Sequence, residues 1–433
     1  MNLCRSERAQ QQMRMSRKSL IALAISIAIS IAISPITLLH NAANANEAPA
    51  TFAFQGSGYG HGVGMSQIGA RAKALAGESA TAILQYYYTG TMVETVTDNQ
   101  ILRVNIGNLL TSAKFRSDSK GAVLQLYEGD LSETQTATPL LTFPSRTFLN
   151  LNLIDGLIAI STTRGTTTKA VTSGSTFTLR WSGTRYQEGP LTVLSVTSAG
   201  ATKRYRHGQI SLKVIRDKTL GKRIALINSV RLQDEYLWGI SEVPSSWPAQ
   251  ALEAQAIASR TYAFAKSTKI RTACDCHLYA TISDQTFAGY SKESEPRFGE
   301  IWKAAVNRTA GSIITYQGRP ITAYFSSSSG GTTETSEHAW GTATPYTVSV
   351  PDSASVDAAI NPRFASWTRE IPQAVVAQAF ALPDVISLAV LSINPAGSVA
   401  LIQAISSDGS FAVLRGETFR SRSKLPSAWF SLK

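Results

Sequence analysis

The sequence predicts an α+β fold, in which a mixed helix and sheet core carries an associated β-rich module. Three observations lead to this prediction: a helical pattern near the start of the chain, a long stretch of strand-like segments, and a second helical pattern in the C-terminal half. The chain has 433 residues, of which 43% are hydrophobic, so it can bury a large core. One large domain and two fused domains are both compatible with this length.

The first helical pattern follows a run of alternating glycines in residues 53–91. Ser66 is the predicted N-cap of a helix that ends at Gly77, where a glycine typically terminates a helix. A second helix is predicted from Thr81 to Tyr88, because its apolar residues repeat at helical spacing.

Residues 100–232 predict strands. Short segments rich in β-branched residues recur there and are separated by Gly, Ser, Thr and Asp; examples are 101–106, 148–154, 177–181 and 191–194. Titratable residues do not gather in this stretch. We therefore interpret it as a β-rich module and not as a reaction centre.

The second helical pattern starts at Ser245-Ser246-Trp247-Pro248 and runs to about Lys266. The serines are expected at the cap, and Pro248 in the first turn, where its missing N–H costs nothing. Small residues recur along this segment at helical spacing. Such a stripe allows another backbone to approach closely, so we expect this helix to be central.

These patterns divide the chain into four parts. We expect a signal peptide at residues 1–45, a Gly-His-Gly segment that packs on the core at 46–99, the β-rich module at 100–215 and the mixed core at 216–433.

The N-terminal segment indicates export. Five basic residues precede an almost uncharged run at 19–39, which Ala43-Asn44-Ala45 follows as a site for signal peptidase. The alternative is an uncleaved anchor, since the run is nearly long enough to span a bilayer, although its serines and Pro35 make it weakly apolar. We predict an exported protein that is periplasmic or associated with the cell wall.

The charge of the exported part favours an anionic polymer of the envelope. Removing residues 1–45 takes five basic residues from 41 and Glu7 from 29 acidic ones, so the net charge falls from +12 to +8. Such a charge outside the cytoplasm suits an acidic polymer. No Lys/Arg-rich run is interleaved with aromatic residues, so we expect no nucleic-acid partner.

Glu242 is a candidate acid. It lies just ahead of the long predicted helix and is flanked by apolar residues, namely Ile240, Val243, Pro244 and Trp247. Desolvation raises the pKa of such a carboxyl, whereas the N-terminus of a helix lowers it. If desolvation dominates, Glu242 can hold a proton near neutral pH and deliver it to a leaving-group oxygen. The alternative is a carboxylate that only complements the helix dipole.

Each of two polar segments could belong to a functional site or be an ordinary loop. The glycine-rich run 56–67 lacks the spacing of a phosphate loop, and its alternating glycines let backbone approach a ligand or a strand closely. His61 in this run is either a site residue or a group that stabilises the loop. The hydroxyl-rich turn 326–335 could line a sugar groove or be an ordinary loop, and no G-x-S-x-G motif supports a serine nucleophile.

Cys274-Asp275-Cys276-His277 contains the only cysteines that follow the predicted signal peptide. Zinc sites usually separate cysteines by two or more residues, and three candidate ligands in four consecutive residues cannot easily reach one tetrahedral ion. We therefore expect no metal and no cofactor. Two cysteines one residue apart do not make a disulfide scaffold, so the fold should depend on its hydrophobic core.

Six segments together carry a family resemblance: 60–67, 228–239, 242–244, 247–262, 284–289 and 328–334. They resemble the SpoIID/LytB family of cell-wall proteins, which includes a sporulation lytic transglycosylase and proteins described as amidase enhancers. In that family the glutamate that matches Glu242 is the proposed catalytic acid. The resemblance implies a peptidoglycan lytic transglycosylase that cleaves MurNAc–GlcNAc bonds with one glutamate as both acid and base, and therefore needs no second carboxylate.

A site at Glu242 needs positioning groups around the reacting bond. The expected substrate-binding residues are His61, Ser66, Gln67, Arg260, Gln285, Ser328, Ser329, Gly330 and Gly331. Peptidoglycan glycan strands are the expected partner, with a cell-wall amidase as a further one. Two alternatives stay open: a non-catalytic, glycan-binding enhancer of an amidase, and a structural module that binds the envelope.

The chain departs from the family pattern in two ways. Some members bind zinc around the segment that matches 273–285, but Asp284 stands where they place a cysteine, so the metal is not carried over. The family's Gly-His-Gly block usually ends the chain, whereas here it opens the exported part. We therefore predict a circular permutation, with the strand at 52–54 beside 430–432 and residues 53–91 packed on the body formed by 233–433.

Overall fold

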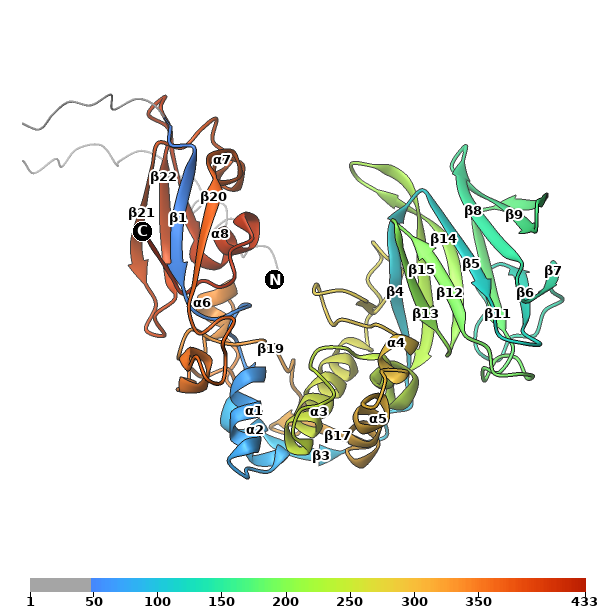
Figure 1. The fold of residues 1–433 in the computed structure, drawn as a ribbon, viewed down its shortest axis with the longest axis horizontal. Coiled ribbons are helices and arrows are strands. Elements are labelled where there is room, and N and C mark those ends of the chain that lie inside the picture. Colours follow the sequence, from blue (N-terminus) through green and yellow to red (C-terminus); the bar gives the residue numbers. More distant parts are fainter. Residues whose placement is uncertain (1–47) are drawn as a thin grey trace, which may run out of the picture. The chain divides into compact units, whose positions relative to one another are not determined.

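Short strands that are broken by turn residues pair into several sheets, and helices lie among them, as the computed structural model in Figure 1 shows. The structure describes residues 48–433, so the predicted signal peptide lies outside the described residues. The mixed α/β architecture confirms the predicted fold class.

Two large sheets form the β-rich part of the chain. The six-stranded sheet is antiparallel and has the order β10 (Thr167–Gly174), β9 (Leu157–Arg164), β8 (Phe148–Ile154), β5 (Ser112–Ser117), β12 (Leu194–Ser198) and β13 (Ala201–Tyr205). The seven-stranded sheet has the order β16 (Leu278–Tyr279), β4 (Ile101–Leu110), β15 (Gly221–Arg231), β14 (Gln209–Asp217), β11 (Thr176–Trp181), β6 (Val123–Glu128) and β7 (Leu141–Pro144). The expected strands are confirmed except the one at 191–194, because β12 begins only at Leu194.

The β-rich part and the helical part share one hydrophobic core. Buried residues from Leu102 on β4 to Val306 belong to a single cluster, and the expected domain boundary at 215/216 falls inside β14. Alternating burial along strands such as β6 directs one face of each sheet into this core.

The predicted helices near the start are confirmed. Ser66 accepts a hydrogen bond from the Gly69 N–H and caps α1 (Gln67–Leu75), and Ser79 caps α2 (Ala80–Tyr87) in the same way. Both helices pack on α3 (Ala249–Lys266), whose small residues allow the close approach that the sequence predicts.

The expected cap of α3 is wrong. The helix begins at Ala249, its N-cap position is Pro248, and no side chain accepts a hydrogen bond there. The Ser245 hydroxyl instead donates to Glu295 Oε2 at 2.6 Å.

The C-terminal part forms a second core that the sequence analysis did not separate. Its two sheets have the orders β20 (Trp367–Pro372), β1 (Thr51–Gly56), β24 (Phe430–Leu432) and β21 (Ser387–Ile393), β22 (Val399–Ile405), β23 (Phe411–Arg415). Helices α7 (Gln373–Phe380) and α8 (Gly416–Ser423) contribute to the same cluster of buried residues.

The remaining elements are short. They are β2 (Met65–Ser66) with β19 (Phe325–Ser326), β3 (Met92–Thr95) with β17 (Ser312–Tyr316) and β18 (Arg319–Pro320), α4 (Tyr290–Glu293), α5 (Gly299–Arg308), α6 (Ser336–Trp340), a π-helical turn (Leu232–Tyr236) and two 3-10 turns (Leu237–Gly239 and Ser353–Val356). Some of them, such as α5 and the π-helical turn, contribute to the first core.

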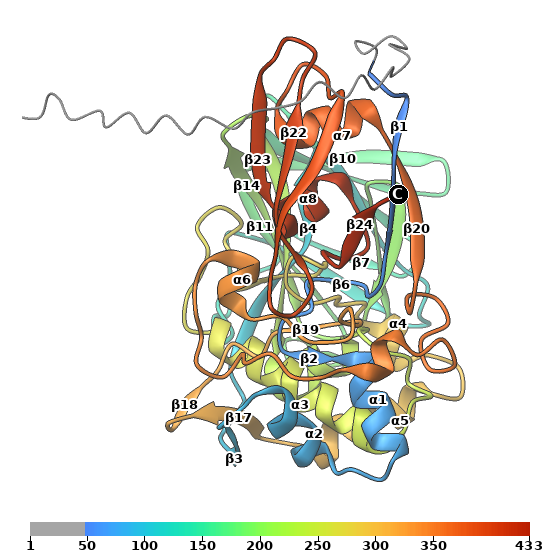
Figure 2. The ribbon, with the colours of Figure 1, turned by 90° about the vertical axis from the view of Figure 1, so that its left-hand side faces the viewer.

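The first described strand lies against the last one. Phe54 of β1 is paired with Leu432 of β24 in antiparallel register, and the Phe54 ring contacts Phe430 with a centroid distance of 5.6 Å. Figure 2 shows β1, at the blue end of the described chain, among orange and red strands. The predicted adjacency of 52–54 and 430–432 is confirmed, as is the packing of residues 53–91 on the body. The permutation itself stays a prediction.

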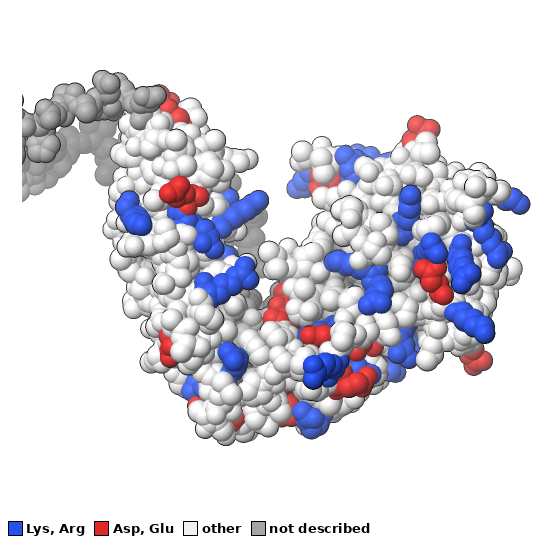
Figure 3. All heavy atoms as spheres, in the orientation of Figure 1, with Lys and Arg blue, Asp and Glu red and all other residues white. Residues whose placement is uncertain are grey.

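The surface of the described residues is mixed in charge. Basic side chains are scattered over the visible face and do not form one continuous stripe (Figure 3). Across residues 48–433, no helix is long and apolar enough to cross a lipid bilayer.

The contact between the two ends of the chain yields a stability prediction. Phe54 is fully buried in the second core, so Phe54→Ala should lower the free energy of unfolding by about 3–5 kcal/mol, as cavity-forming aromatic truncations do. Urea unfolding followed by circular dichroism measures this change, with Thr51→Ala on the exposed end of β1 as the control. A loss below about 1 kcal/mol would show that β1 is not integral to the core.

Candidate active site

Glu242 lies on a short loop that a second segment holds in place. Ile240 forms an antiparallel bridge with Phe287, and the Ser241 N–H donates to the Thr286 carbonyl at 2.8 Å. These backbone contacts flank the glutamate directly. The position of its carboxyl group is therefore set by main-chain geometry and not by side-chain packing alone.

The Glu242 carboxyl is partly withdrawn from water. It is half-buried and accepts a hydrogen bond from the Thr286 N–H. Burial raises the pKa of Glu242, and the hydrogen bonds from Thr286 oppose that rise only in part. Desolvation therefore outweighs these hydrogen bonds, and the carboxyl keeps its proton to a higher pH than an ordinary glutamate does.

Gln285 stabilises the segment that holds Glu242. It is fully buried; its Oε1 accepts a hydrogen bond from the Tyr236 hydroxyl at 2.8 Å, and its Nε2 donates to the Ser259 carbonyl at 3.3 Å. Both ends of the amide are thus engaged by protein groups. The side chain fixes the position of the neighbouring Thr286 on which the Glu242 hydrogen bond depends.

Gln67 belongs to the same buried network. Its Nε2 donates to Gln255 Oε1 at 3.1 Å, and Gln255 donates to the Ser259 hydroxyl at 3.0 Å. Residues 67 and 285, far apart in sequence, are therefore joined through α3.

A second carboxylate, Asp284, precedes this segment but is fully engaged. Arg271 donates to both of its oxygens at 2.8 and 2.6 Å, the Tyr262 hydroxyl donates at 2.8 Å, and the Tyr279 N–H donates at 2.8 Å. The side chain of Asp284 is 1% exposed. It has no free lone pair with which to activate a water molecule.

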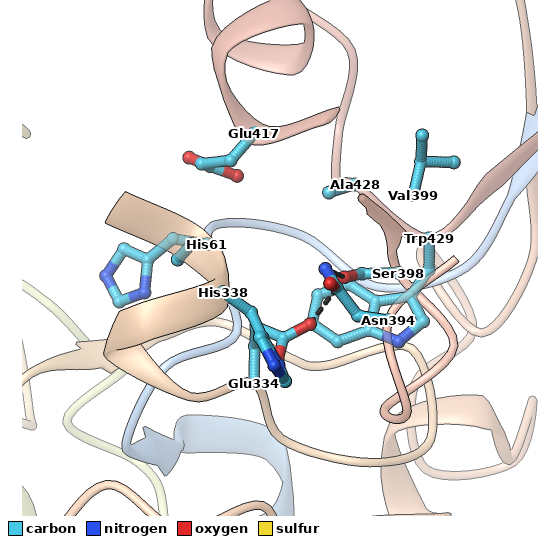
Figure 4. Close-up of a pocket in the computed structure, with 10 residues that line it drawn as sticks. His61, Glu334, His338, Asn394, Ser398, Val399, Glu417, Ala428 and Trp429 are labelled. Carbon is cyan, nitrogen blue, oxygen red and sulfur yellow. Dashed lines mark hydrogen bonds and ion pairs between the residues drawn. The ribbon is translucent and has the colours of Figure 1, made fainter. Parts of the chain in front are cut away.

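His61 lies in a different cluster, shown in Figure 4. It lines a small cavity of about 10 Å³ together with Glu334, His338 and Glu417. Its Nδ1 accepts a hydrogen bond from the Val63 N–H at 3.0 Å. Burial lowers the pKa of His61 to about 3, so its ring is neutral at physiological pH.

Aromatic rings connect the His61 cluster with the surroundings of Glu242. The His61 ring lies 6.4 Å from Tyr324, Tyr324 lies 6.4 Å from Tyr262, and Tyr262 hydrogen-bonds to Asp284. No hydrogen bond joins His61 to Glu242 in residues 48–433. The link between them is therefore indirect.

Ser66 and Arg260 have structural partners. Ser66 caps α1, and its hydroxyl lies 3.2 Å from that of Ser355. Arg260 is 0% exposed; its guanidinium donates to Asp98 Oδ2 at 2.7 Å and to the Val306 carbonyl at 3.0 Å. In this structure the Arg260 side chain is thus enclosed by the protein and does not reach a surface on which a glycan could bind.

In the turn that contains Ser328, Ser329, Gly330 and Gly331, both serines are fully buried and both glycines are half-buried. The Ser328 hydroxyl accepts from Asn361 at 3.3 Å, and Ser329 donates to Asp352 at 2.7 Å. A β-carbon on Gly330 would lie 2.0 Å from the Trp429 ring, so only glycine fits this contact. The turn joins the glycine-rich loop to the C-terminal core.

The cysteine segment contains a disulfide that the sequence analysis did not predict. Cys274 is bonded to Cys276, and Asp275 between them adopts a φ of 50° and forms ion pairs with Arg103 and Lys213. Neither thiol is then available as a thiolate ligand.

These residues do not fit the zinc site of some family members. The thiols are consumed by the disulfide, and Asp284 is held by Arg271. Within residues 48–433, no group of three His, Cys, Asp or Glu side chains is placed to hold a metal ion. We therefore derive no chemistry from a metal in this chain.

Comparison with known families finds a match for the part of the chain that contains the Glu242 loop. Residues 221–316 match the family model described as SpoIID, stage II sporulation protein. The matched range includes Glu242 and Gln285 but neither His61 nor the turn at 328–331.

Three curated relatives each match part of the chain. The amidase enhancer of Bacillus subtilis (strain 168) is 37% identical over 113 residues, which are 26% of this chain and 14% of that protein. Stage II sporulation protein D of the same organism is 34% identical over 129 residues, 27% of this chain and 37% of the relative. Stage II sporulation protein D of Bacillus amyloliquefaciens is 29% identical over 163 residues, 35% and 43% respectively. The chain spans less than half the length of each of these relatives.

The raised pKa of Glu242 predicts a pH-dependent stability difference. Because the folded state holds the proton more tightly than the unfolded state, ionisation destabilises the fold as the pH rises above the ordinary value of 4.5. Glu242→Gln cannot ionise, so its gain in stability over the parent should be absent below that pH and should grow above it. Urea unfolding at pH 4 and pH 8 tests this, with exposed Glu370→Gln as the charge-matched control. A gain that is equal at both pH values contradicts the assignment.

The burial of Arg260 predicts a loss of stability. Arg260→Ala leaves the buried Asp98 carboxylate unpaired and should cost about 3–5 kcal/mol in the free energy of unfolding. The double variant Asp98→Ala/Arg260→Ala should lose less than the sum of the two single changes. If Arg260→Ala is as stable as the parent but loses glycan affinity, Arg260 contacts substrate after all.

Proposed function

This chain carries a SpoIID domain, and from that premise we propose that it is a peptidoglycan lytic transglycosylase with Glu242 as its acid and base. The observation that carries the proposal is the Glu242 carboxyl itself: it is half-buried, its pKa is raised by burial, and the backbone on both sides of it is fixed. A protonated carboxyl held in one position is what a general acid requires.

The reaction needs one carboxyl group that acts twice. Protonated Glu242 donates its proton to the glycosidic oxygen, and the bond from that oxygen to C1 of the muramyl unit breaks to leave an oxocarbenium-like centre. The Glu242 carboxylate then removes the proton from the C6 hydroxyl of the same sugar. That oxygen attacks C1, a 1,6-anhydro ring forms, and the glutamate is protonated again.

The state of Asp284 favours this route over hydrolysis. An inverting hydrolase needs a second carboxylate that is free to activate water. Four donors already occupy the oxygens of Asp284, among them both contacts from Arg271. Intramolecular attack by the C6 hydroxyl uses no activated water and so suits a site with one available carboxyl.

We also infer different roles for the expected substrate-binding residues. Gln67 and Gln285 stabilise the site from the protein interior, through the buried amide network that ends beside Thr286. His61 supports it through the aromatic rings of Tyr324 and Tyr262. Ser66, Arg260 and the turn at 328–331 hold the surrounding elements together.

A second function is favoured by one relative. The amidase enhancer of Bacillus subtilis is 37% identical over the matched residues, and its name describes activation of another enzyme. A glycan-binding enhancer that recruits a cell-wall amidase would bind the glycan without turnover. Both functions place the protein outside the cytoplasm, in the periplasm or at the cell wall.

The antiparallel pairing of β1 with β24 supports the inference of a circular permutation. Lys433 already donates from its N–H to the Ala53 carbonyl at 3.0 Å, so a short hairpin turn would close the described chain end to end. The Gly-His-Gly block would then follow the C-terminal strand, as it does in the family pattern.

Replacing Glu242 with a residue that cannot donate a proton tests the proposed function. Glu242→Gln retains the shape and should remain folded and bind glycan, while anhydro-sugar ends form about 10²–10⁴-fold more slowly, the range typical of a lost general acid. Purified peptidoglycan, intact and stripped of peptides, serves as substrate, and mass spectrometry counts anhydro ends.

The control is Glu300→Gln, which removes a carboxyl that is 82% exposed on α5. Unchanged turnover in Glu242→Gln would remove Glu242 from its role, and ordinary reducing ends in the parent's products would indicate hydrolysis. No turnover by the parent, together with stimulation of an added amidase that survives Glu242→Gln, would establish the enhancer function instead.

A further inference from the structure

An open hollow lies outside the Glu242 loop, between the end of α6 and the exposed side of α8. Its volume is about 370 Å³, and Trp340, Arg415 and Arg422 line it. This volume falls within the range of small-molecule sites, which is about 300–1,000 Å³. The hollow lies beyond residues 221–316, the part that matches the SpoIID model.

Trp340 presents an indole surface to this hollow. The residue is 41% exposed, although tryptophan is usually well buried. Its ring is held from other sides by His61 at 5.1 Å and by Tyr324 at 4.7 Å, measured between ring centroids. A braced, exposed indole offers a flat apolar face against which the C–H face of a sugar can stack.

Arg415 and Arg422 provide positive charge without carboxylate partners. Both are exposed, and neither forms an ion pair within residues 48–433. Arg415 donates to the Glu337 carbonyl at 3.3 Å, and Arg422 donates to the Ala379 carbonyl at 2.7 Å. The remaining N–H groups of each guanidinium are free to bind a carboxylate, for which their planar geometry is suited.

The acidic residue in the wall does not cancel this charge. Glu417 is held by Arg420 through two hydrogen bonds of 2.8 and 2.7 Å, and its side chain is 12% exposed. This pair is neutral in total, so the hollow keeps the charge of Arg415 and Arg422. An aromatic platform beside two unpaired arginines suits a ring that carries an anionic group.

We propose that this hollow binds a carboxylate-bearing sugar unit of the glycan strand. The sugar ring stacks on Trp340, and its carboxylate binds Arg415 and Arg422. The inference rests on the proposed function for its choice of polymer. In peptidoglycan the carboxylate has two sources, the lactyl group of a peptide-stripped muramyl unit and the stem peptide of an intact one.

The aromatic rings relate this subsite to the reaction centre. Trp340 contacts Tyr324, Tyr324 contacts Tyr262, and Tyr262 hydrogen-bonds to Asp284, two residues before Thr286. A glycan strand bound at Trp340 is thereby anchored away from the bond that is cleaved. Such remote binding positions a long polymer and discriminates against neutral glycans.

Binding is measured in the full chain carrying Glu242→Gln, so that the ligand stays intact whether or not the parent is an enzyme. Isothermal titration uses three ligands: peptide-stripped glycan oligomers, peptide-bearing oligomers, and neutral chitotetraose. Arg415→Gln/Arg422→Gln should weaken binding of the stripped oligomers about tenfold, as expected for two solvent-exposed charge contacts, and should change chitotetraose binding by less than about twofold. Trp340→Ala should weaken all three.

The control is Arg369→Gln, because Arg369 is also exposed and donates only to a backbone carbonyl, but lies on β20. Unchanged affinity in the double arginine variant, an equal loss in Arg369→Gln, or chitotetraose bound as tightly as stripped glycan would each overturn the proposal. Tighter binding of stripped oligomers identifies the lactyl carboxylate, and tighter binding of peptide-bearing oligomers identifies the stem. Absence of turnover by the parent, with arginine-dependent binding retained, rejects the transglycosylase function and leaves the subsite standing.

Discussion

The burial of α3 is the constraint on which the rest of the structure depends. Twelve of its eighteen residues are buried, and the polar ones among them, from Gln255 to Thr261, must find partners in the interior. Those partners come from every part of the chain: Gln67 from the start, Asp98 before the first long strand, and Gln285 from the segment that holds Glu242. The helix thus acts as the common support of elements that are distant in sequence.

The buried polar residues of α3 and their partners make the site rigid. Burying these polar groups costs free energy, which their hydrogen bonds offset. A buried amide left without a partner destabilises a protein by about 1–3 kcal/mol, and a buried charged group by more, so the network is stable only when it is complete. Completeness fixes Gln285 and hence Thr286, whose N–H defines where the Glu242 carboxyl lies. The position of the Glu242 carboxyl therefore depends on the packing of α3.

Sequence patterns predicted what depends on local spacing. The helices after Ser66 and Ser79 and most strands of the β-rich part could be predicted in this way, whereas the adjacency of Phe54 and Leu432 was predicted only from the family resemblance. The environments of Arg260 and Ser329 could not be predicted. A polar residue that binds a ligand and a polar residue that forms hydrogen bonds in the protein interior look the same in sequence. The partners of these two residues, Asp98 and Asp352, are apparent only in the three-dimensional structure. The short strands of the second core and the disulfide across Asp275 were missed for the same reason, since each depends on contacts or backbone conformations that no periodicity encodes.

The alternating glycines are needed because the loop that contains them packs closely where it connects the two cores. The loop leaves β1 in the C-terminal core and reaches the helices that pack on α3, and on the way it passes between a serine carbonyl and a tryptophan ring. A β-carbon on Gly58 would lie 2.4 Å from the Ser329 carbonyl oxygen, and one on Gly62 would lie 2.2 Å from Trp429, so neither position accepts a larger residue. His61, between them in sequence, is consequently held where its ring braces Trp340 and Tyr324. Its importance to a glycan-binding surface would then lie in fixing the aromatic rings, which a neutral imidazole can do without exchanging a proton.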